Sequence, residues 1–136
     1  MLAACATDDK LNLISDHFGD AKYYNIYDVN ENDYSLKETI VNKTTSDLHS
    51  DPKKAKQILD LLHTKGVHLL INKAFGANIK VVNKFVLPVV IRVDLIEDVI
   101  KLVQNSFSII ENVLETKKDC YLIIKQDEGV KVIETI

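Results

Sequence analysis

Apolar and polar positions follow one another in blocks along the chain, and these blocks predict strands and helices. Residues 2–7 are apolar almost throughout, which is typical of a short buried strand. Residues 22–29 and 34–42 alternate between apolar and polar positions, and a polar turn cluster over 30–33 separates them. The two alternating segments are therefore predicted to form a hairpin with one face exposed to water.

The next block changes from the period of a strand to the period of a helix. Asp51-Pro52 is expected to begin this helix, with the aspartate as N-cap and the proline in the first turn, and Gly66 is expected to end it. The apolar stripe at i, i+3, i+4 and i+7 comprises Ala55, Ile58, Leu59 and Leu62. Residues 67–71 are then apolar apart from one histidine, as in a strand of a parallel sheet covered on both faces.

The second half of the chain repeats this order of helix and strand. A short helix is predicted over 76–84 and a strand over 88–92. Asp94 is expected to cap a further helix that begins at about residue 95, and its helical spacing continues to Thr116. One long helix and two helices broken near Asn105-Ser106 both fit this spacing, and we expect the break.

The C-terminal segment has the signature of a β-hairpin over residues 119–135, with Gln126-Asp127-Glu128-Gly129 as its turn. Its apolar face comprises Leu122, Ile124, Val130 and Val132. An isolated hairpin is marginally stable in water, so this face needs cover from the domain or from a second copy in a homodimer. We expect one domain over residues 1–116 and a hairpin extension over 117–136 that packs on it and either extends its sheet or pairs with another subunit.

Composition limits the classes of function. The 136 residues are 46% hydrophobic, which is enough for one domain with one core. The formal net charge of −3 gives no bulk attraction to nucleic acid or to an acidic membrane. Two cysteines are too few for a disulfide scaffold, which favours a reducing cytoplasm. The apolar run over 85–91 is interrupted by Pro88 and is too short to span a bilayer.

Two stretches carry a resemblance to a known family. The first runs from Ala6-Thr7-Asp8-Asp9 through Ser15-Asp16-His17-Phe18-Gly19-Asp20-Ala21 to an aromatic strand that ends in Tyr27-Asp28. The second comprises residues 61–71, then Phe75-Gly76 and Leu87-Pro88-Val89-Val90. Together they resemble the dinitrogenase iron–molybdenum cofactor-binding family over about residues 1–104.

The resemblance implies an α/β fold with a ribonuclease-H-like mixed sheet of five strands flanked by helices, to which the C-terminal hairpin is an extension. The order of elements agrees, since antiparallel strands come first and two β–α units follow. The resemblance also implies a small cytoplasmic cofactor carrier that binds an anionic cluster of the iron–molybdenum or iron–sulfur type. Its partners would be the proteins that donate or accept that cluster.

His17 is the residue that the resemblance identifies as the cluster ligand. A neutral imidazole on a polar loop at the lip of a sheet can bind metal, with Asp16 or Asp20 holding its other nitrogen. The structural alternative is a loop histidine that fixes a turn by bonding a backbone carbonyl. The motif favours the ligand.

Further residues could form the rim of a cofactor cleft around His17. Asp8 and Asp9 follow the first strand, and His49, Lys53 and Lys54 flank the start of a helix, where the dipole disfavours cations. The lysines either meet an anion there or belong to a solvated basic face. Gly76 opens the 76–84 helix, where its amide could contact an anion or its small size could let that helix approach the sheet closely. No glycine lies between Gly19 and Gly66, whereas members of the family often have a glycine-rich loop there.

Several other reactive residue types are expected to be structural. His63 and His68 flank a helix end and a strand start, and Cys5 lies inside the first strand. Asp8, Asp9 and Asp28 suggest a two-metal nuclease, but the strand that ends at Ile71 is followed by Asn72-Lys73 and offers no acid. No nucleophile or acid–base pair emerges, so we expect binding rather than catalysis, with a cofactor-free interaction module as the alternative.

Overall fold

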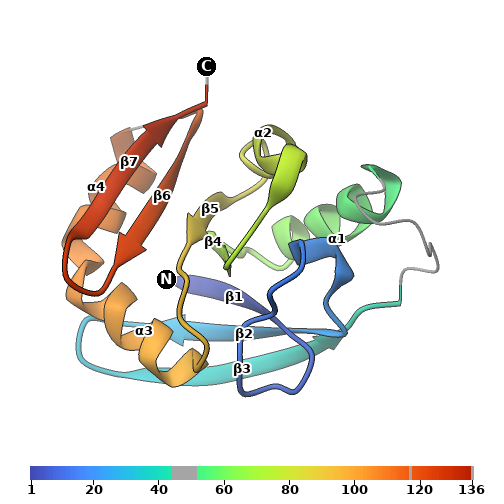
Figure 1. Ribbon diagram of the computed structural model, residues 1–136, viewed down its shortest axis with the longest axis horizontal. Helices are drawn as coiled ribbons and strands as arrows, with labels where there is room; N and C mark the ends of the chain where they lie inside the picture. The colour runs from blue at the N-terminus through green and yellow to red at the C-terminus, as the bar shows by residue number, and fades with distance from the viewer. Residues whose placement is uncertain (44–51, 117, 136) are drawn as a thin grey trace.

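A seven-stranded mixed sheet forms the centre of the protein (Figure 1). The computed structural model describes residues 1–43, 52–116 and 118–135. The strands are β1 (Leu2–Thr7), β2 (Tyr23–Val29), β3 (Tyr34–Val41), β4 (Leu69–Asn72), β5 (Leu87–Val90), β6 (Cys120–Lys125) and β7 (Gly129–Glu134). The helices are α1 (Pro52–Thr64), α2 (Ile79–Val82), α3 (Ile96–Asn105) and α4 (Phe107–Thr116), with 3-10 turns η1 (Phe18–Asp20) and η2 (Gly76–Asn78).

The strand order across the sheet is β3-β2-β1-β4-β5-β6-β7. β1, β4, β5 and β6 pair in parallel, while β2 is antiparallel to both β1 and β3, and β7 is antiparallel to β6. Five strands therefore share one direction, and their carboxyl ends lie along one edge of the sheet. We call this edge the carboxyl edge and the opposite one the amino edge.

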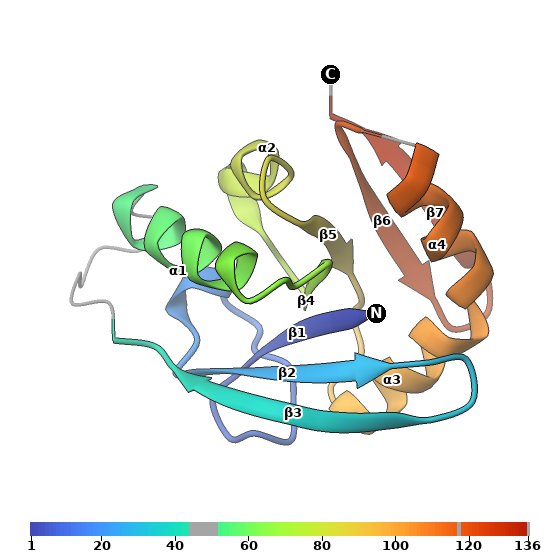
Figure 2. The same ribbon diagram turned by 180° about the vertical axis from the view of Figure 1, so that it is seen from behind.

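The helices cover both faces of the sheet, as Figures 1 and 2 show, with α1 and α2 on one side and α3 and α4 on the other. Alternation along β1 fits this arrangement, because Ala4 and Ala6 belong to the core under α1 whereas Ala3 and Cys5 belong to the core under α3 and α4.

The β4–α2–β5 and β5–α3–α4–β6 connections step the same way across the sheet but over opposite faces. They therefore have opposite hands, although such connections are nearly always right-handed.

The C-terminal hairpin is part of the main sheet. Residues Val89 and Val90 of β5 lie opposite Leu122 and Ile123 of β6 in parallel register. The expected five-stranded sheet is thus corrected to seven strands, because β6 forms backbone hydrogen bonds with β5 and β7 follows it. Of the two predicted placements, extension of the sheet is the one observed. The apolar face is covered by the domain itself: Leu122 and Ile124 are buried, and Val130 and Val132 are partly buried.

The helices follow the sequence pattern, apart from the cap of α3 and the helix predicted over 76–84, which is a 3-10 turn over Gly76–Asn78 and an α-helix only over Ile79–Val82. The predicted α1 stripe is buried, and Gly66 ends the helix with φ +78° and an N–H donated to the His63 carbonyl at 3.0 Å. The predicted break is confirmed by α3 and α4, which meet at the buried Ser106. The prediction that Asp94 caps α3 is wrong: the N-cap is Leu95, without a side-chain cap, because the Asp94 carboxylate forms an ion pair with Lys73.

The cap expected at Asp51 lies outside the described residues. Among the helices that the structure describes, none combines the length and the apolar character needed to cross a membrane.

Candidate functional site

The loop that carries His17 connects β1 to β2 at the carboxyl edge. Phe18 anchors this loop to the core: its side chain is fully buried and packs against Phe75, with ring centroids 5.6 Å apart. The buried Tyr24 hydroxyl donates a 2.6 Å hydrogen bond to the Phe18 carbonyl. His17 itself is half-buried at the start of η1, where its carbonyl accepts the Asp20 N–H at 3.0 Å. The anchored neighbours hold the backbone of His17 at the lip of the sheet.

Gly76 lies directly under the imidazole of His17. A Cβ added to Gly76 would be 2.7 Å from both Cε1 and Nε2 of His17 and 3.1 Å from Cδ2. Gly76 also has φ +65°, a conformation that side chains rarely adopt. The structure thus brings together two of the predicted site residues, His17 and Gly76. These distances show a contact between Gly76 and the His17 ring that neither of the two roles considered for this glycine described.

Asn72, at the end of β4, connects the two loops that contain His17 and Gly76. Its side chain is fully buried, and its Nδ2 donates to the carbonyls of Asp16 and Ala74, each at 2.9 Å. Its Oδ1 is buried and has no hydrogen-bond partner among the described residues. Such an unpaired buried acceptor is costly and uncommon in proteins. Sequence reasoning missed this residue; the only signal was an amide that closes an apolar strand.

The carboxylates of Asp8 and Asp9 both stabilise loop backbone. Asp8 accepts the Lys22 N–H at 2.9 Å. Asp9 accepts the N–H groups of Leu11 and Asn12 at 2.9 and 2.8 Å and the side-chain amide of Asn12 at 2.8 Å. These hydrogen bonds, that of the Asn12 side chain first, hold the pKa of Asp9 well below its usual range. Both residues lie at the expected edge of the sheet, and the two carboxylates are bonded within their own loop.

The start of α1 is joined to the His17 loop by an ion pair. The Lys54 ammonium lies 3.0 Å from Asp20 Oδ1, and the two side chains are only 13% and 12% exposed. Asp20 therefore supplies the anion that offsets Lys54 against the helix dipole, while Lys53 is exposed. His49 lies outside the described residues. A second link, not anticipated from sequence, comes from Asn42, whose amide donates to the carbonyls of Gly19 and Ala21 at 3.1 and 2.7 Å.

The topology brings the starts of two longer helices to the carboxyl edge. α1 and α3 each follow a strand that runs in the common direction, so their amino ends lie at the carboxyl edge. The first turn of α3 contains Glu97 and Asp98, whereas the first turn of α1 contains no acid. This end of the sheet therefore favours a negatively charged ligand near α1.

The donors present suit a preassembled cluster better than a bare ion. Among the described residues, no group of three histidine, cysteine or acidic side chains is arranged to hold a metal. A bare zinc ion needs three or four protein ligands. A cluster carries its own bridging ligands and can be held by a single imidazole. The ring of His17, supported on Gly76, is the candidate donor for such a cluster.

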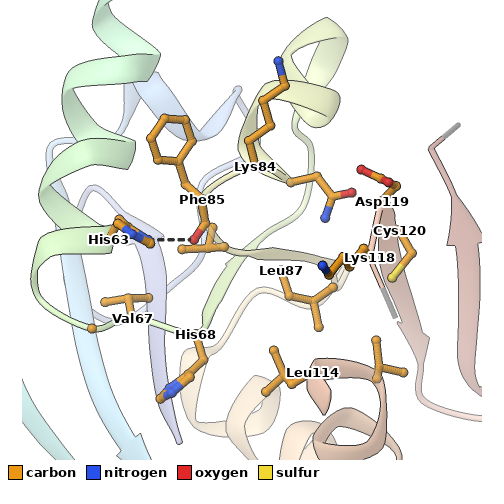
Figure 3. A pocket seen from close by; sticks show the side chains of 14 residues that line it. His63, Val67, His68, Lys84, Phe85, Leu87, Leu114, Lys118, Asp119 and Cys120 are labelled. Carbon is orange, nitrogen blue, oxygen red and sulfur yellow. Dashed lines mark hydrogen bonds between the residues drawn. The ribbon is translucent and has the colours of Figure 1, made fainter. Parts of the chain in front are cut away.

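A separate pocket of about 650 Å³ opens at the amino edge, between the end of α1, the start of β5 and the end of α4 (Figure 3). Two histidines that sequence analysis assigned to structural roles line it. His63 Nδ1 lies 3.2 Å from the Phe85 carbonyl, and His68 Nδ1 accepts the Leu2 N–H at 3.0 Å. Burial, and then the N-terminal ammonium, lower the pKa of His68. The thiol of Cys120 lies in its wall, buried.

The electrostatics of this pocket differ from those of the carboxyl edge. α1, α2 and α4 all end here, so the partial negative charge of their last carbonyls surrounds the pocket. Basic side chains lie at these helix ends, where a cation compensates the dipole: His63 in the last turn of α1, Lys84 after α2 and Lys118 after α4. The pocket at the amino edge is therefore bordered by helix carbonyls and by basic side chains.

Comparison with known proteins identifies a family and a similar fold. A family model described as dinitrogenase iron-molybdenum cofactor matches residues 1–106. The crystal structure of a protein designated PH0822 is similar in fold, with a TM-score of 0.58 and 23% sequence identity over 78% of this chain and 92% of that one. At this identity the likeness concerns the fold alone. No curated protein matches the chain.

Proposed function

The chain belongs to the dinitrogenase iron-molybdenum cofactor family, and from this premise we propose that it binds or carries an anionic metal cluster of the iron–molybdenum or iron–sulfur type without catalysing a reaction. The observation that carries this proposal is the imidazole of His17, which stands on Gly76 at the carboxyl edge of the sheet. His17 would be the protein ligand to the cluster. Binding requires its neutral ring, and the start of α1 would complement the negative charge.

Further parts of the proposal rest on the same features. The order β3-β2-β1-β4-β5, with β2 antiparallel, supports a ribonuclease-H-like assignment for the first five strands. Both cysteines are buried and neither forms a disulfide within the described residues, which supports work in the cytoplasm; burial raises the pKa of Cys5 to about 12, so this thiol is unreactive. A carrier would exchange its cluster with a donor and an acceptor protein. β7, at the end of the sheet order, is the strand through which two copies could pair.

A second candidate function is a cofactor-free interaction or regulatory module on the same fold. The observation that favours it is that Lys54 and Lys73, two cations close to the carboxyl edge, already form ion pairs with Asp20 and Asp94. A site that binds a large anion is expected to contain basic side chains that are not already engaged in ion pairs with the protein. The sequence between Gly19 and Gly66 also lacks the glycine that close contact with a bulky cofactor favours.

Loading with a cluster under anaerobic conditions separates the two candidates. The full chain is incubated with isolated iron–molybdenum cofactor, desalted, and analysed by visible absorption and by iron and molybdenum content. We expect the wild type to retain the cluster and His17→Ala to lose it. Because His17 is a half-buried loop side chain, its replacement is expected to change the free energy of unfolding by no more than about 1 kcal/mol.

His63→Ala is the matched control, because it removes a histidine from the amino edge and should load like the wild type. Retention of metal by His17→Ala at the wild-type level would contradict His17 as the ligand. A wild type that retains no iron or molybdenum would favour the cofactor-free module.

A further inference from the structure

The three distances from the absent Cβ of Gly76 fix how the imidazole of His17 lies. The Cβ would be equally far, 2.7 Å, from Cε1 and Nε2, and only slightly farther, 3.1 Å, from Cδ2. Contact with the edge of the ring would leave Cδ2 much more distant than the two edge atoms. The Cβ position is therefore above the face of the ring, over the Cε1–Nε2 bond. Gly76 consequently supports the face of the imidazole and leaves the in-plane directions of its nitrogens unobstructed by this residue.

Two independent requirements for glycine coincide at position 76. The first is its φ of +65°, which strains any residue with a side chain. The second is the space that the imidazole occupies, since real Cβ atoms essentially never come within 3.0 Å of another heavy atom in this way. Gly129 shares the first requirement, with φ +75°, but a Cβ there would meet nothing within 4 Å. Comparison of the two glycines therefore isolates the contact with His17.

The loops on either side of this contact are too well anchored to separate easily. Asn72 hydrogen-bonds Asp16 and Ala74, the residues one before His17 and two before Gly76. Phe18 and Phe75, each adjacent to one of the stacked residues, pack against each other in the core. A side chain at position 76 would clash with the His17 ring. Because the backbone is anchored, rotation of the ring rather than movement of the backbone would chiefly relieve this clash.

We infer that Gly76 is a positioning residue for His17: the absence of its side chain lets the face of the imidazole lie on the backbone of Gly76, which sets the orientation of the ring. The inference rests on the proposed function, in which His17 is a ligand. It goes further by assigning to Gly76 the orientation of that ligand.

A double-mutant cycle tests the contact without any cofactor. Gly76→Ala should reduce the folding equilibrium constant at least about twofold more than Gly129→Ala, because displacement of the His17 ring, the end of a side chain that can rotate away, is added to the shared φ strain. In a His17→Ala background this excess should disappear. If Gly76→Ala alone does not fold, recovery of folding in the His17→Ala/Gly76→Ala double variant supports the inference, and failure of both to fold overturns it. Equal effects of Gly76→Ala in both backgrounds also overturn it.

Two further measurements report orientation. The NMR resonances of the His17 ring, assigned by their loss in His17→Ala, should shift in Gly76→Ala and stay unchanged in Gly129→Ala; unchanged ring resonances in Gly76→Ala would overturn the inference. Cluster retention should fall at least about tenfold in Gly76→Ala and not in Gly129→Ala. If the apo variants behave as expected and the wild type retains no cluster, the proposed function fails while the contact stands. If the wild type loads and the cycle shows no coupling, only the inference fails.

Discussion

Individual polar side chains hold the loops of the carboxyl edge in place through hydrogen bonds to the loop backbone. The carboxylate of Asp9 is the clearest case. It is exposed, yet its two carboxylate oxygens accept hydrogen bonds from Leu11 and from the backbone and side chain of Asn12. Fully buried Thr7 adds to the same turn, since its hydroxyl donates to the Asn12 carbonyl and accepts the Lys10 N–H. The polar residues after β1 thus close the loop that precedes His17.

Asp9→Asn is expected to destabilise the protein at neutral pH and to have less effect in acid. The pKa of Asp9 is lowered in the folded state by these hydrogen bonds. Its contribution is therefore present above the ordinary aspartate pKa of about 4 and is lost as the pH falls below it. Urea unfolding at a series of pH values should show the difference between wild type and variant shrinking progressively as the pH falls below about 4, toward the lowered pKa of folded Asp9. Asp16→Asn, at an exposed position in the same loop, serves as control and should change stability by less than about 0.5 kcal/mol.

Contacts between elements decide how the His17 loop sits on the rest of the protein. The ion pair of Asp20 and Lys54 joins η1 to α1, and the pair of Lys73 and Asp94 joins the loops that follow β4 and β5. The buried face of α1 supplies the apolar part of the same interface, with Leu59 and Leu62 fully buried. Long-range contacts, rather than the local turn, therefore fix the position of the candidate ligand.

Lys54→Met should lower the free energy of unfolding by about 1–3 kcal/mol, because it removes the 3.0 Å ion pair of the largely buried Asp20 carboxylate. Asp20→Leu in the same background should recover part of this loss, since a buried ion pair and an apolar pair can be similar in stability. The matched control is Lys65→Met. Lys65 also lies near α1 and pairs with Glu38 of β3 at 2.8 Å, but the two side chains are 33% and 41% exposed, so the expected loss is below about 1 kcal/mol. Equal losses at the two lysines would contradict a special role for the Asp20 pair.

At the scale of the whole molecule, the C-terminal hairpin completes the core that α3 and α4 share with the sheet. Cys120, Leu122 and Ile124 are all buried in the same cluster as Val99 and Val113. Without β6, β5 would become an edge strand and the apolar faces of both helices would lose cover. The hairpin is structurally integrated with the family-matched region.

Truncation after Thr116 should therefore lower solubility and melting temperature, and should also break any dimer that forms through β7. Light scattering and thermal unfolding measure these effects. Glu128→Ala, at a 70% exposed side chain in the hairpin turn, is the control and should leave both unchanged. A truncated protein that stays soluble, keeps its oligomeric mass and melts with the full chain would show that the hairpin is dispensable.

Much of the fold could be predicted from local pattern. Alternation over 22–29 and 34–42 anticipated β2 and β3, the stripe on α1 anticipated its buried face, and the break at Asn105-Ser106 separated α3 from α4. These predictions succeed because the period of apolar positions reports which side of one element is buried, and that information is contained within the element.

The candidate site could be predicted only as separate residues. The motif identified His17 and the start of the helix after Phe75 identified Gly76, but nothing local indicated that the ring of one lies on the backbone of the other. The role of Asn72 was missed for the same reason, since its two carbonyl partners belong to different loops.

The sequence by itself determined the number, type and buried faces of the elements and the histidine on which the proposed function depends. Only the tertiary structure decided that β6 extends the sheet beside β5, that Asp20 neutralises Lys54, and that Gly76 supports His17. Strand pairing uses backbone groups that every residue has, so side-chain pattern does not choose the neighbour. Contacts between loops depend on where the strands end in space, which is fixed only after the sheet has assembled.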